Sequence, residues 1–385
     1  MVIYIKEQGA RIVKEGKHLL VKKGDATCHT LFTYKLKQVV IFGNVEITHR
    51  ALAQLMRQEI DTVFLTQSGR YLGRISSSES RNVFLRKRQY DLLNDHEFTL
   101  RMAKSIVAGK FSNMATLLMR IKRTKDAKIA AQKAREIHDL FQPLQKATTL
   151  ESIRGYEGRG SALYFEGFAQ GFVGDMGFSK RVRRPPTDPV NSVLSLLYTF
   201  LMNRVYAAIR VASLDPYPGF LHTIDYGRYS LVLDLMEEFR TIIVDTLTLS
   251  LFNLKILKQD DFYTEKPTIL EPSDPETKVS PSDVTKDPIG LISPIAEDEE
   301  LFDLPDQRME EDPVVPKSFV KYPVKLHDHA MRKVIEAFEK KLTTEFYYPL
   351  AERRMTYGDA IIFQANQFRK VIEGEATTYQ PLLLK

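Results

Sequence analysis

Two carboxylates inside an apolar helical stripe are the residues of this sequence best placed to do chemistry. From Ser230, a candidate N-cap, apolar residues recur at four-residue spacing as far as Phe239 and predict a helix. Asp234 and Glu237 lie three residues apart and therefore share a face of that helix. Because carboxylates beside a buried stripe are costly when unpaired, we expect a cation near them.

An imidazole stands just upstream of this predicted helix. The turn at residues 215–219, with the sequence Asp-Pro-Tyr-Pro-Gly, delivers His222 near the start of the helix. With the two carboxylates, His222 would complete a mixed nitrogen and oxygen ligand set for a metal ion. The alternative is a solvated acidic face that pairs with Arg240 or another base, and the spacing alone leaves both interpretations open.

A third carboxylate, that of Glu157, lies among three glycines. Gly155, Gly158 and Gly160 fall within residues 149–165, whose pattern is otherwise helical. Because glycine costs a helix about 1 kcal/mol relative to alanine, we expect something to approach this backbone closely. A neighbouring helix and a phosphodiester backbone are both candidates.

The scaffold that must position these residues is predicted to be an α+β fold with two domains. Residues 1–85 contain short β-branched and aromatic runs punctuated by glycines, with one helix after Thr48, and predict a small β-rich domain. From residue 86 the hydrophobic period changes from two to 3.6, which predicts a larger all-α catalytic domain over residues 86–385. Its helices, besides the one after Ser230, are predicted at residues 88–107, 111–123, 127–141, 148–172, 190–211, 324–342 and 355–372.

Charge is divided unevenly along the chain, whose net charge is +6. Residues 260–315 hold 17 acidic and 4 basic residues, a net charge of −13, so the remainder carries +19. Residues 262–321 are also rich in proline, which predicts a disordered acidic insert. The segment from Arg101 to Arg135 contains ten lysines and arginines but only one acidic residue. Such a run suits a surface that faces phosphates, although a solvated helix face is the alternative.

Composition also excludes several classes of protein. The single cysteine, Cys28, rules out a disulfide within the chain and argues against a cysteine zinc site. We find neither a secretory signal nor about 18 consecutive apolar residues, and therefore expect a cytoplasmic protein without a membrane span. The strongly apolar residues 190–211 are predicted to form a buried core helix.

Several motifs together resemble the CRISPR-associated spacer integrases, the metal-dependent endonuclease subunits of the adaptation machinery. Each motif is weak alone, but their order and spacing are specific and extend through nearly the whole chain. The matching segments are residues 43–48, 68–73, 86–89, 155–158, 164–165, 184–191, 214–222, 230–240 and 364–365. Thr241 stands where the family leads us to expect proline, and the acidic insert is longer than expected.

The resemblance implies that Glu157, His222 and Glu237 bind a divalent ion, with Asp234 as a second acidic position close to it. One imidazole and two carboxylates suit Mg²⁺ or Mn²⁺ better than a closed zinc site. The implied reaction inserts spacer DNA into a repeat array through attack by a 3′-OH on a phosphodiester, so it requires no protein nucleophile.

The resemblance also implies partners and DNA contacts. The partners are double-stranded DNA, a second copy of this chain paired through the β-rich domain, and a small ferredoxin-like adaptation protein, all in the prokaryotic cytoplasm. The candidate DNA contacts are Arg159, Arg183, Arg184, Asn191 and Tyr164. Helix ends and surface charge are alternative roles for the arginines, and a core position is the more common place for a tyrosine.

Two other functions are compatible with the net positive charge of the chain outside residues 260–315. A non-catalytic nucleic-acid scaffold would pair its carboxylates with arginines and would bind DNA with a steep dependence on salt. A membrane-surface protein is disfavoured because the basic helices lack a large apolar face opposite their charge.

The acidic insert allows a separate hypothesis. Its net charge of −13 beside a body of +19 would let it mimic DNA and cover the basic surface. Deleting residues 265–318 is then expected to tighten DNA binding at low salt, measured by fluorescence anisotropy. Unchanged affinity would instead identify the insert as a tolerated surface loop.

Overall fold

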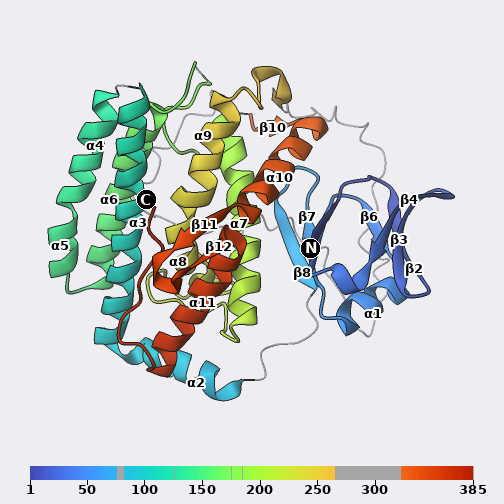
Figure 1. The fold of residues 1–385 in the computed structure, drawn as a ribbon, viewed down its shortest axis with the longest axis horizontal. Helices are drawn as coiled ribbons and strands as arrows, with labels where there is room; N and C mark the ends of the chain where they lie inside the picture. Colours follow the sequence, from blue (N-terminus) through green and yellow to red (C-terminus); the bar gives the residue numbers. More distant parts are fainter. Residues whose placement is uncertain (76–81, 126, 175, 184, 265–321, 385) are drawn as a thin grey trace, which may run out of the picture.

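A β-rich N-terminal part stands beside a larger helical part, which confirms the predicted α+β class (Figure 1). The structure is a computed structural model that describes residues 1–75, 82–125, 127–174, 176–183, 185–264 and 322–384. Strands and one helix account for the regular structure as far as Ile75, and from Val83 onward helices dominate.

Two four-stranded sheets form the β-rich part. The first has the order β1-β5-β7-β8, with β1 Val2–Ile5, β5 Gln38–Phe42, β7 Asp61–Leu65 and β8 Tyr71–Ile75. The second has the order β4-β3-β2-β6, with β2 Ala10–Glu15, β3 His18–Lys23, β4 Ala26–Phe32 and β6 Val45–Ile47. Helix α1 (His49–Arg57) begins at the predicted N-cap, Thr48, whose hydroxyl accepts the backbone N–H of Ala51.

Strand β5 joins the β-rich part to the helical part. Its five residues are all buried, as expected for a strand that is covered on both faces. Val39 and Ile41 point into the small core shared with the second sheet and α1, because side chains alternate along a strand. Val40 and Phe42 point the other way into the large helical core, where Phe42 meets Phe200 edge to face.

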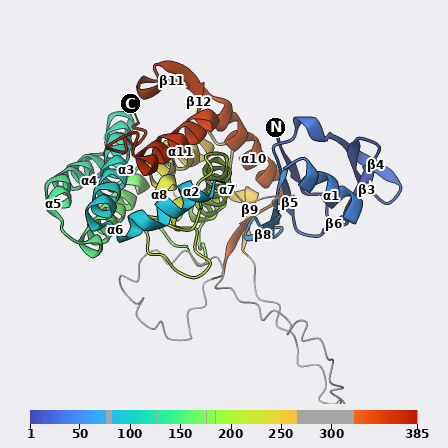
Figure 2. The ribbon, with the colours of Figure 1, turned by 90° about the horizontal axis from the view of Figure 1, so that it is seen from below.

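Eleven α-helices are present among the residues that the structure describes, and most of them pack on α3 or α7. Figure 2 shows α3 and α6 side by side, with α4 and α5 on their outer side. The helices that follow α1 are α2 Val83–Asp91, α3 His96–Lys125, α4 Lys128–Asp139, α5 Phe141–Lys146, α6 Leu150–Ala169, α7 Pro189–Val211, α8 Ser230–Phe239, α9 Thr246–Asn253, α10 Asp328–Thr343 and α11 Tyr357–Glu373.

The prediction of two helices over residues 88–107 and 111–123 is wrong. The chain instead forms the short α2 and then one 30-residue helix, α3, that continues through Gly109. A Cβ atom at Gly109 would lie 2.4 Å from the Pro381 ring, so this glycine allows the C-terminal segment to cross the helix. Tertiary packing therefore keeps Gly109 inside the helix, although glycine has a low helix propensity.

Helix α7 is the central helix of the large core, as predicted. It is long and apolar enough to cross a membrane by composition alone, but 61% of its most apolar window is buried inside the fold. Asp188 caps its first turn by accepting the backbone N–H of Asn191, and Pro189 occupies the first helical position.

The C-terminal part departs from the prediction at its element boundaries. Strand β10 (Val324–Leu326) precedes α10, and a hairpin of β11 (Glu345–Tyr348) and β12 (Arg353–Thr356) precedes α11. Strand β9 (Phe262–Thr264) pairs antiparallel with β10, so residues 262–264 are ordered rather than part of the predicted insert. Residues 265–321 of that insert lie outside the described residues.

Candidate active site

The loop that carries His222 is tied to helices on both sides. Gln89 of α2 donates to the carbonyl oxygens of Asp215 and Pro218, and it accepts the backbone N–H of Asp215. On the other side, Arg154 of α6 donates to the carbonyl of Leu221 at 2.6 Å. Because Glu157 lies one turn further along α6, the same helix positions the loop and one candidate ligand.

Asp234 binds this loop from α8. Its carboxylate accepts the backbone N–H groups of Phe220, Leu221 and His222 at 2.5, 3.0 and 2.9 Å. Gly219 makes this approach possible, since a Cβ there would lie 2.8 Å from Asp234 Oδ2 and 2.6 Å from the Ser230 backbone. Helix α8 begins at Ser230, which is therefore the first helical residue rather than the predicted N-cap.

Asp234 also fixes the imidazole of His222. Nδ1 lies 2.7 Å from Asp234 Oδ1, and because an ionised carboxylate only accepts, Nδ1 carries the hydrogen. In the neutral ring, Nε2 then presents a lone pair, and it lies 3.8 Å from Glu237 Oε1. A lone pair and a carboxylate this close favour a cation between them. Asp234 therefore orients the candidate ligand His222.

The three predicted ligands come together in the core. Glu157, His222 and Glu237 are all more than 90% buried, so the carboxylates do not form the solvated acidic face that we considered. The ammonium of Lys110, from α3, contacts Glu157 Oε1 and lies 2.6 Å from Glu237 Oε2. Lys110 was not predicted as a site residue, because in the sequence it is one base within a long basic run.

The donor set fits a divalent ion, although a lysine lies within it. Cis ligands of Mg²⁺ are about 2.9 Å apart and trans ligands about 4.2 Å, given ion–oxygen distances of about 2.1 Å. The separation of 3.8 Å between His222 Nε2 and Glu237 Oε1 lies between these two values, so these atoms would have to shift to bind an ion. Within the residues that the structure describes, no group of three His, Cys, Asp or Glu side chains is ready to hold a metal. Lys110 contacts one oxygen of each of the two candidate ligand carboxylates, Glu157 and Glu237.

Arg240 supplies a second base beside Glu237, as the alternative interpretation of the sequence expected. Its Nε lies 3.1 Å from Glu237 Oε1, and its guanidinium lies over the Tyr198 ring. Residues Arg240–Asp245 form a π-helical turn at the end of α8. The extra residue of this turn directs Asp245 toward the hydroxyls of Tyr164 and Tyr198, which both donate to it at 2.6 Å.

The next residue on α8, Glu238, holds the C-terminal segment. Its carboxylate accepts the Tyr379 hydroxyl, the Leu382 backbone N–H and the Gln364 amide. Burial raises the pKa of Glu238 to about 7, although these three donors oppose the shift. Asn113 of α3 adds bonds to the carbonyls of Glu238 and Leu382.

Removing one of these bonds is expected to destabilise the fold. Tyr379→Phe should lower the free energy of unfolding by about 1–3 kcal/mol, because it leaves a buried carboxyl oxygen of Glu238 without its donor. Urea unfolding followed by circular dichroism measures the change. Tyr347→Phe is the matched control at an exposed tyrosine and should have almost no effect. Equal effects of the two variants would contradict the role of Glu238.

The structure corrects two candidate DNA contacts. Tyr164 is fully buried against Asp245, so no face of its ring is open to a nucleotide. Asn191 is also fully buried, and its side chain binds Arg181 and the backbone of residues 180–182 at the start of α7. Arg159 is exposed and Arg183 half-buried, and their contact with DNA stays a prediction. Arg184 lies outside the described residues.

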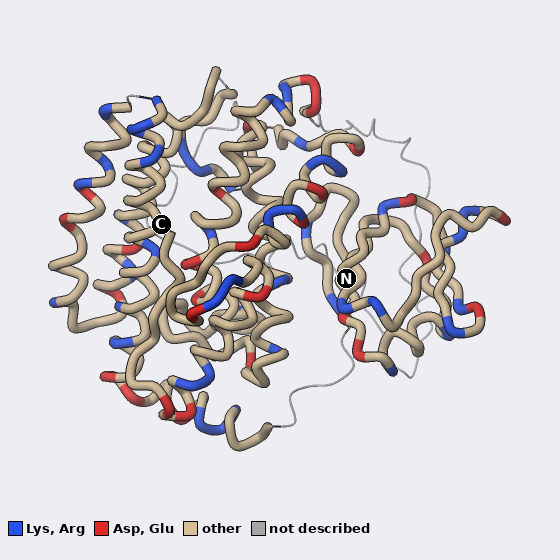
Figure 3. Tube along the Cα trace, in the orientation of Figure 1, with Lys and Arg blue, Asp and Glu red and all other residues tan. Residues whose placement is uncertain are grey.

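The basic run from Arg101 to Arg135 is not one continuous surface. Lys110 is buried at the site, and Lys133 pairs with Glu136 and Glu166. The exposed bases gather where α3 ends and α4 begins, at the upper end of this helix pair in Figure 3. A surface for phosphates is therefore expected at that end.

The glycines around Glu157 have different surroundings. A Cβ at Gly160 would meet the Phe111 ring of α3 at 2.3 Å, which favours the neighbouring helix as the reason for this glycine. At Gly155 nothing lies within 4 Å of such a Cβ, so close helix packing does not explain it.

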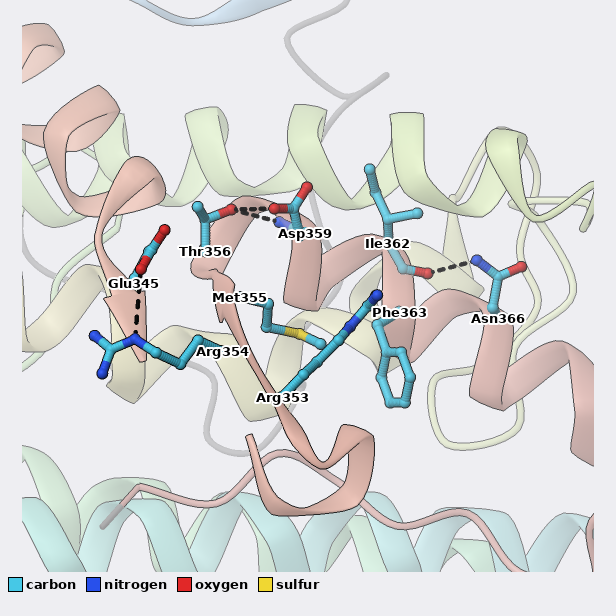
Figure 4. A pocket seen from close by; sticks show the side chains of 9 residues that line it. All are labelled: Glu345, Arg353, Arg354, Met355, Thr356, Asp359, Ile362, Phe363 and Asn366. Carbon is cyan, nitrogen blue, oxygen red and sulfur yellow. Dashed lines mark hydrogen bonds and ion pairs between the residues drawn. The ribbon is translucent and has the colours of Figure 1, made fainter. Parts of the chain in front are cut away.

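A hollow between the β11–β12 hairpin and α11 lies apart from these residues (Figure 4). It is lined by Glu345, Arg353, Arg354, Met355, Thr356, Asp359, Ile362, Phe363 and Asn366. Its ion pair between Glu345 and Arg354 is exposed. No candidate ligand lines this hollow, so the proposed chemistry belongs to the buried cluster instead.

Comparisons with known proteins identify the family of this chain. The family model described as CRISPR associated protein Cas1 matches residues 3–273. A protein of Thermus thermophilus named "CRISPR-associated endonuclease Cas1 3" is 29% identical over 391 residues, covering 100% of this chain and 97% of that protein.

Solved structures share the fold. A "Casposase bound to integration product" has a TM-score of 0.76 at 19% identity, covering 98% of this chain and 92% of that one. A "Cas6-RT-Cas1--Cas2 complex" has a TM-score of 0.77 at 23% identity; this chain is fully covered and spans 36% of that chain. The family match over most of the chain shows that this protein belongs to the Cas1 family of CRISPR-associated proteins.

Proposed function

We propose that this protein is a divalent-metal-dependent DNA endonuclease and integrase of CRISPR adaptation. The observation that carries the proposal is a buried cluster in which the Lys110 ammonium joins Glu157 to Glu237, Glu237 lies 3.8 Å from His222, and Asp234 holds the imidazole. Family membership and the endonuclease names of its relatives support the same reaction. The proposed substrates are double-stranded spacer DNA and the repeat array.

Each residue of the cluster has a distinct task. Asp234 holds the loop and keeps the hydrogen of His222 on Nδ1, so that Nε2 is available as a donor. Ser161 donates to Glu157 Oε1 at 2.8 Å and restricts the rotation of that carboxylate. Arg240 offsets part of the charge of Glu237. These contacts support the proposal because they hold the side chains of the three proposed ligands in fixed orientations.

Glu157, His222 and Glu237 would hold Mg²⁺ or Mn²⁺. When bound, such an ion polarises a phosphoryl oxygen and stabilises the charge on the attacking or leaving 3′ oxygen. The loop that carries His222 and helices α6 and α8 would keep the three ligands in position. Their burial limits the access of bulk water to them.

We also propose that the protein works as a homodimer with a small ferredoxin-like adaptation partner in the prokaryotic cytoplasm. The similar fold found in a structure titled as a complex with Cas2 supports a partner of this kind. The exposed bases at the α3–α4 junction would contact the phosphates of DNA.

A non-catalytic DNA-binding scaffold is the second candidate. It is favoured by one specific observation, since Glu237 pairs with both Lys110 and Arg240 and so has cationic partners without a metal. This candidate predicts DNA binding that falls steeply with salt and is indifferent to metal.

Strand transfer distinguishes the two candidates. A short duplex is incubated with a supercoiled plasmid that carries the repeat, the purified protein and its cognate small partner, in Mn²⁺ or in EDTA. Joining that requires Mn²⁺ supports the integrase. Salt-dependent DNA binding without joining in any divalent metal would favour the scaffold.

A further inference from the structure

Lys110 is the residue of the cluster to which the proposed reaction gives no task. It projects from α3 and is only 4% exposed, which is rare for a lysine. Its ammonium contacts Glu157 on α6 and Glu237 on α8, and so joins three helices at one point. A position this buried is not a contact with DNA phosphates.

The charges at this point explain why a cation is needed. Two ionised carboxylates that share one cation lie close together, and each costs several kcal/mol to bury without compensation. The ammonium of Lys110 balances one of these charges, and Arg240 lies 3.1 Å from Glu237 on another side. Without Lys110, the pair would repel and would attract any other available cation.

A divalent ion cannot share this point with the ammonium. Mg²⁺ binds carboxylate oxygens at about 2.0–2.1 Å and requires octahedral coordination. An ammonium group has neither requirement. The oxygens that Lys110 contacts belong to the same two carboxylates that would hold the ion. Two cations within about 4 Å also repel strongly in a medium of low dielectric constant. Metal binding therefore requires Lys110 to move.

We propose that Lys110 is a placeholder cation for the metal site. Its ammonium neutralises Glu157 and Glu237 while no divalent ion is bound, and the ion displaces it from between them. The flexible four-carbon stem of lysine allows this movement without a shift of α3. The exchange keeps the buried carboxylates paired with a cation in both the metal-free and the metal-bound protein. Because the ammonium must first be displaced, the apparent affinity for metal is lowered.

This inference rests on the proposed metal site and is tested by metal binding rather than by strand transfer. Mn²⁺ is titrated by calorimetry into the full-length protein and into Lys110→Met. The variant is expected to bind Mn²⁺ at least about tenfold more tightly, because no ammonium competes for the carboxylates. It should also gain more thermal stability from Mn²⁺ than the unsubstituted protein, starting from a lower Tm without metal.

Lys104→Met is the matched control, because Lys104 lies on the same helix but donates to the carbonyl of Gln145, away from the cluster. Its Mn²⁺ affinity should equal that of the unsubstituted protein. Equal or weaker Mn²⁺ binding by Lys110→Met would overturn the placeholder role while leaving the metal site intact. Absence of Mn²⁺ binding in all three proteins would instead overturn the metal site and the placeholder together.

A second measurement covers the case in which Lys110→Met does not fold. A crystal structure of the unsubstituted protein grown with Mn²⁺ should show the Lys110 ammonium more than 4 Å from at least one of the two carboxylates. An ammonium that still contacts both carboxylates beside a bound Mn²⁺ would overturn the proposal.

Discussion

His222→Ala is expected to lower metal-dependent strand transfer by at least about 10²- to 10³-fold. Loss of the imidazole removes one of three proposed ligands, and the contribution of a bound metal to such a reaction is several kcal/mol, with each 1.36 kcal/mol worth a factor of ten. The fold should survive, because Asp234 still accepts the backbone N–H groups of Phe220 and Leu221 and keeps the loop in place. Joined product on a sequencing gel measures the loss.

His138→Ala serves as the control for this variant, because His138 is exposed and packs beside Phe141 on the outer helices. It should transfer strands at the unsubstituted rate. Glu157→Ala is expected to match His222→Ala, since each removes one proposed ligand of the same ion. Normal strand transfer by folded His222→Ala would refute the assignment of the site.

Asp234→Ala should have the largest effect on stability. The substitution leaves three backbone N–H groups and the Nδ1 hydrogen of His222 without their acceptor in a buried loop. Each buried, unsatisfied donor costs about 1–3 kcal/mol, so we expect a loss of at least about 3–5 kcal/mol in the free energy of unfolding. Urea unfolding at fixed pH measures this loss.

Asp234→Asn separates stability from ligand orientation. Its amide oxygen can still accept two of the four hydrogen bonds, so part of the stability should return. It cannot accept with both side-chain atoms, and its NH₂ group would compete with the Nδ1 hydrogen, so His222 would lose its fixed orientation. Mn²⁺ affinity should fall about 10–100-fold, as for other partners of metal-binding histidines. Full metal affinity in the Asn variant would exclude the orienting role.

The local parts of the site could be predicted from the sequence. The four-residue spacing after Ser230 located α8, and the prolines and glycine of residues 215–219 located the loop that carries His222. The pairing of Asp234 with that loop was not predicted, because spacing shows which residues share a face but not what lies opposite. Asp234 was expected close to the metal without being assigned as a ligand, and the structure shows its carboxylate bonded to the His222 ring.

The long-range parts could not be predicted. Lys110 lies 47 residues before Glu157. It belongs to a basic run whose high density of charge suggests an exposed helix surface. Only the packing of α3 against α6 and α8 buries it, and no periodicity encodes that packing. The continuation of α3 through Gly109 has the same origin, because Pro381 lies 272 residues further along the chain. Tertiary contacts here override local propensity.

The bonds between Glu238 and the C-terminal segment also set an order of events during translation. Glu238 and Tyr379 are separated by 141 residues, which a ribosome adds in roughly seven to thirty seconds at about 5–20 residues per second. During that interval α8 has left the ribosome, while the donors to its buried carboxylate do not yet exist. Helix α8 is therefore expected to reach its final packing only late in synthesis. Ribosome-stalled chains that end before Tyr379 should have α8 open to protease, and chains stalled on an added linker that carries Leu384 out of the exit tunnel should protect it.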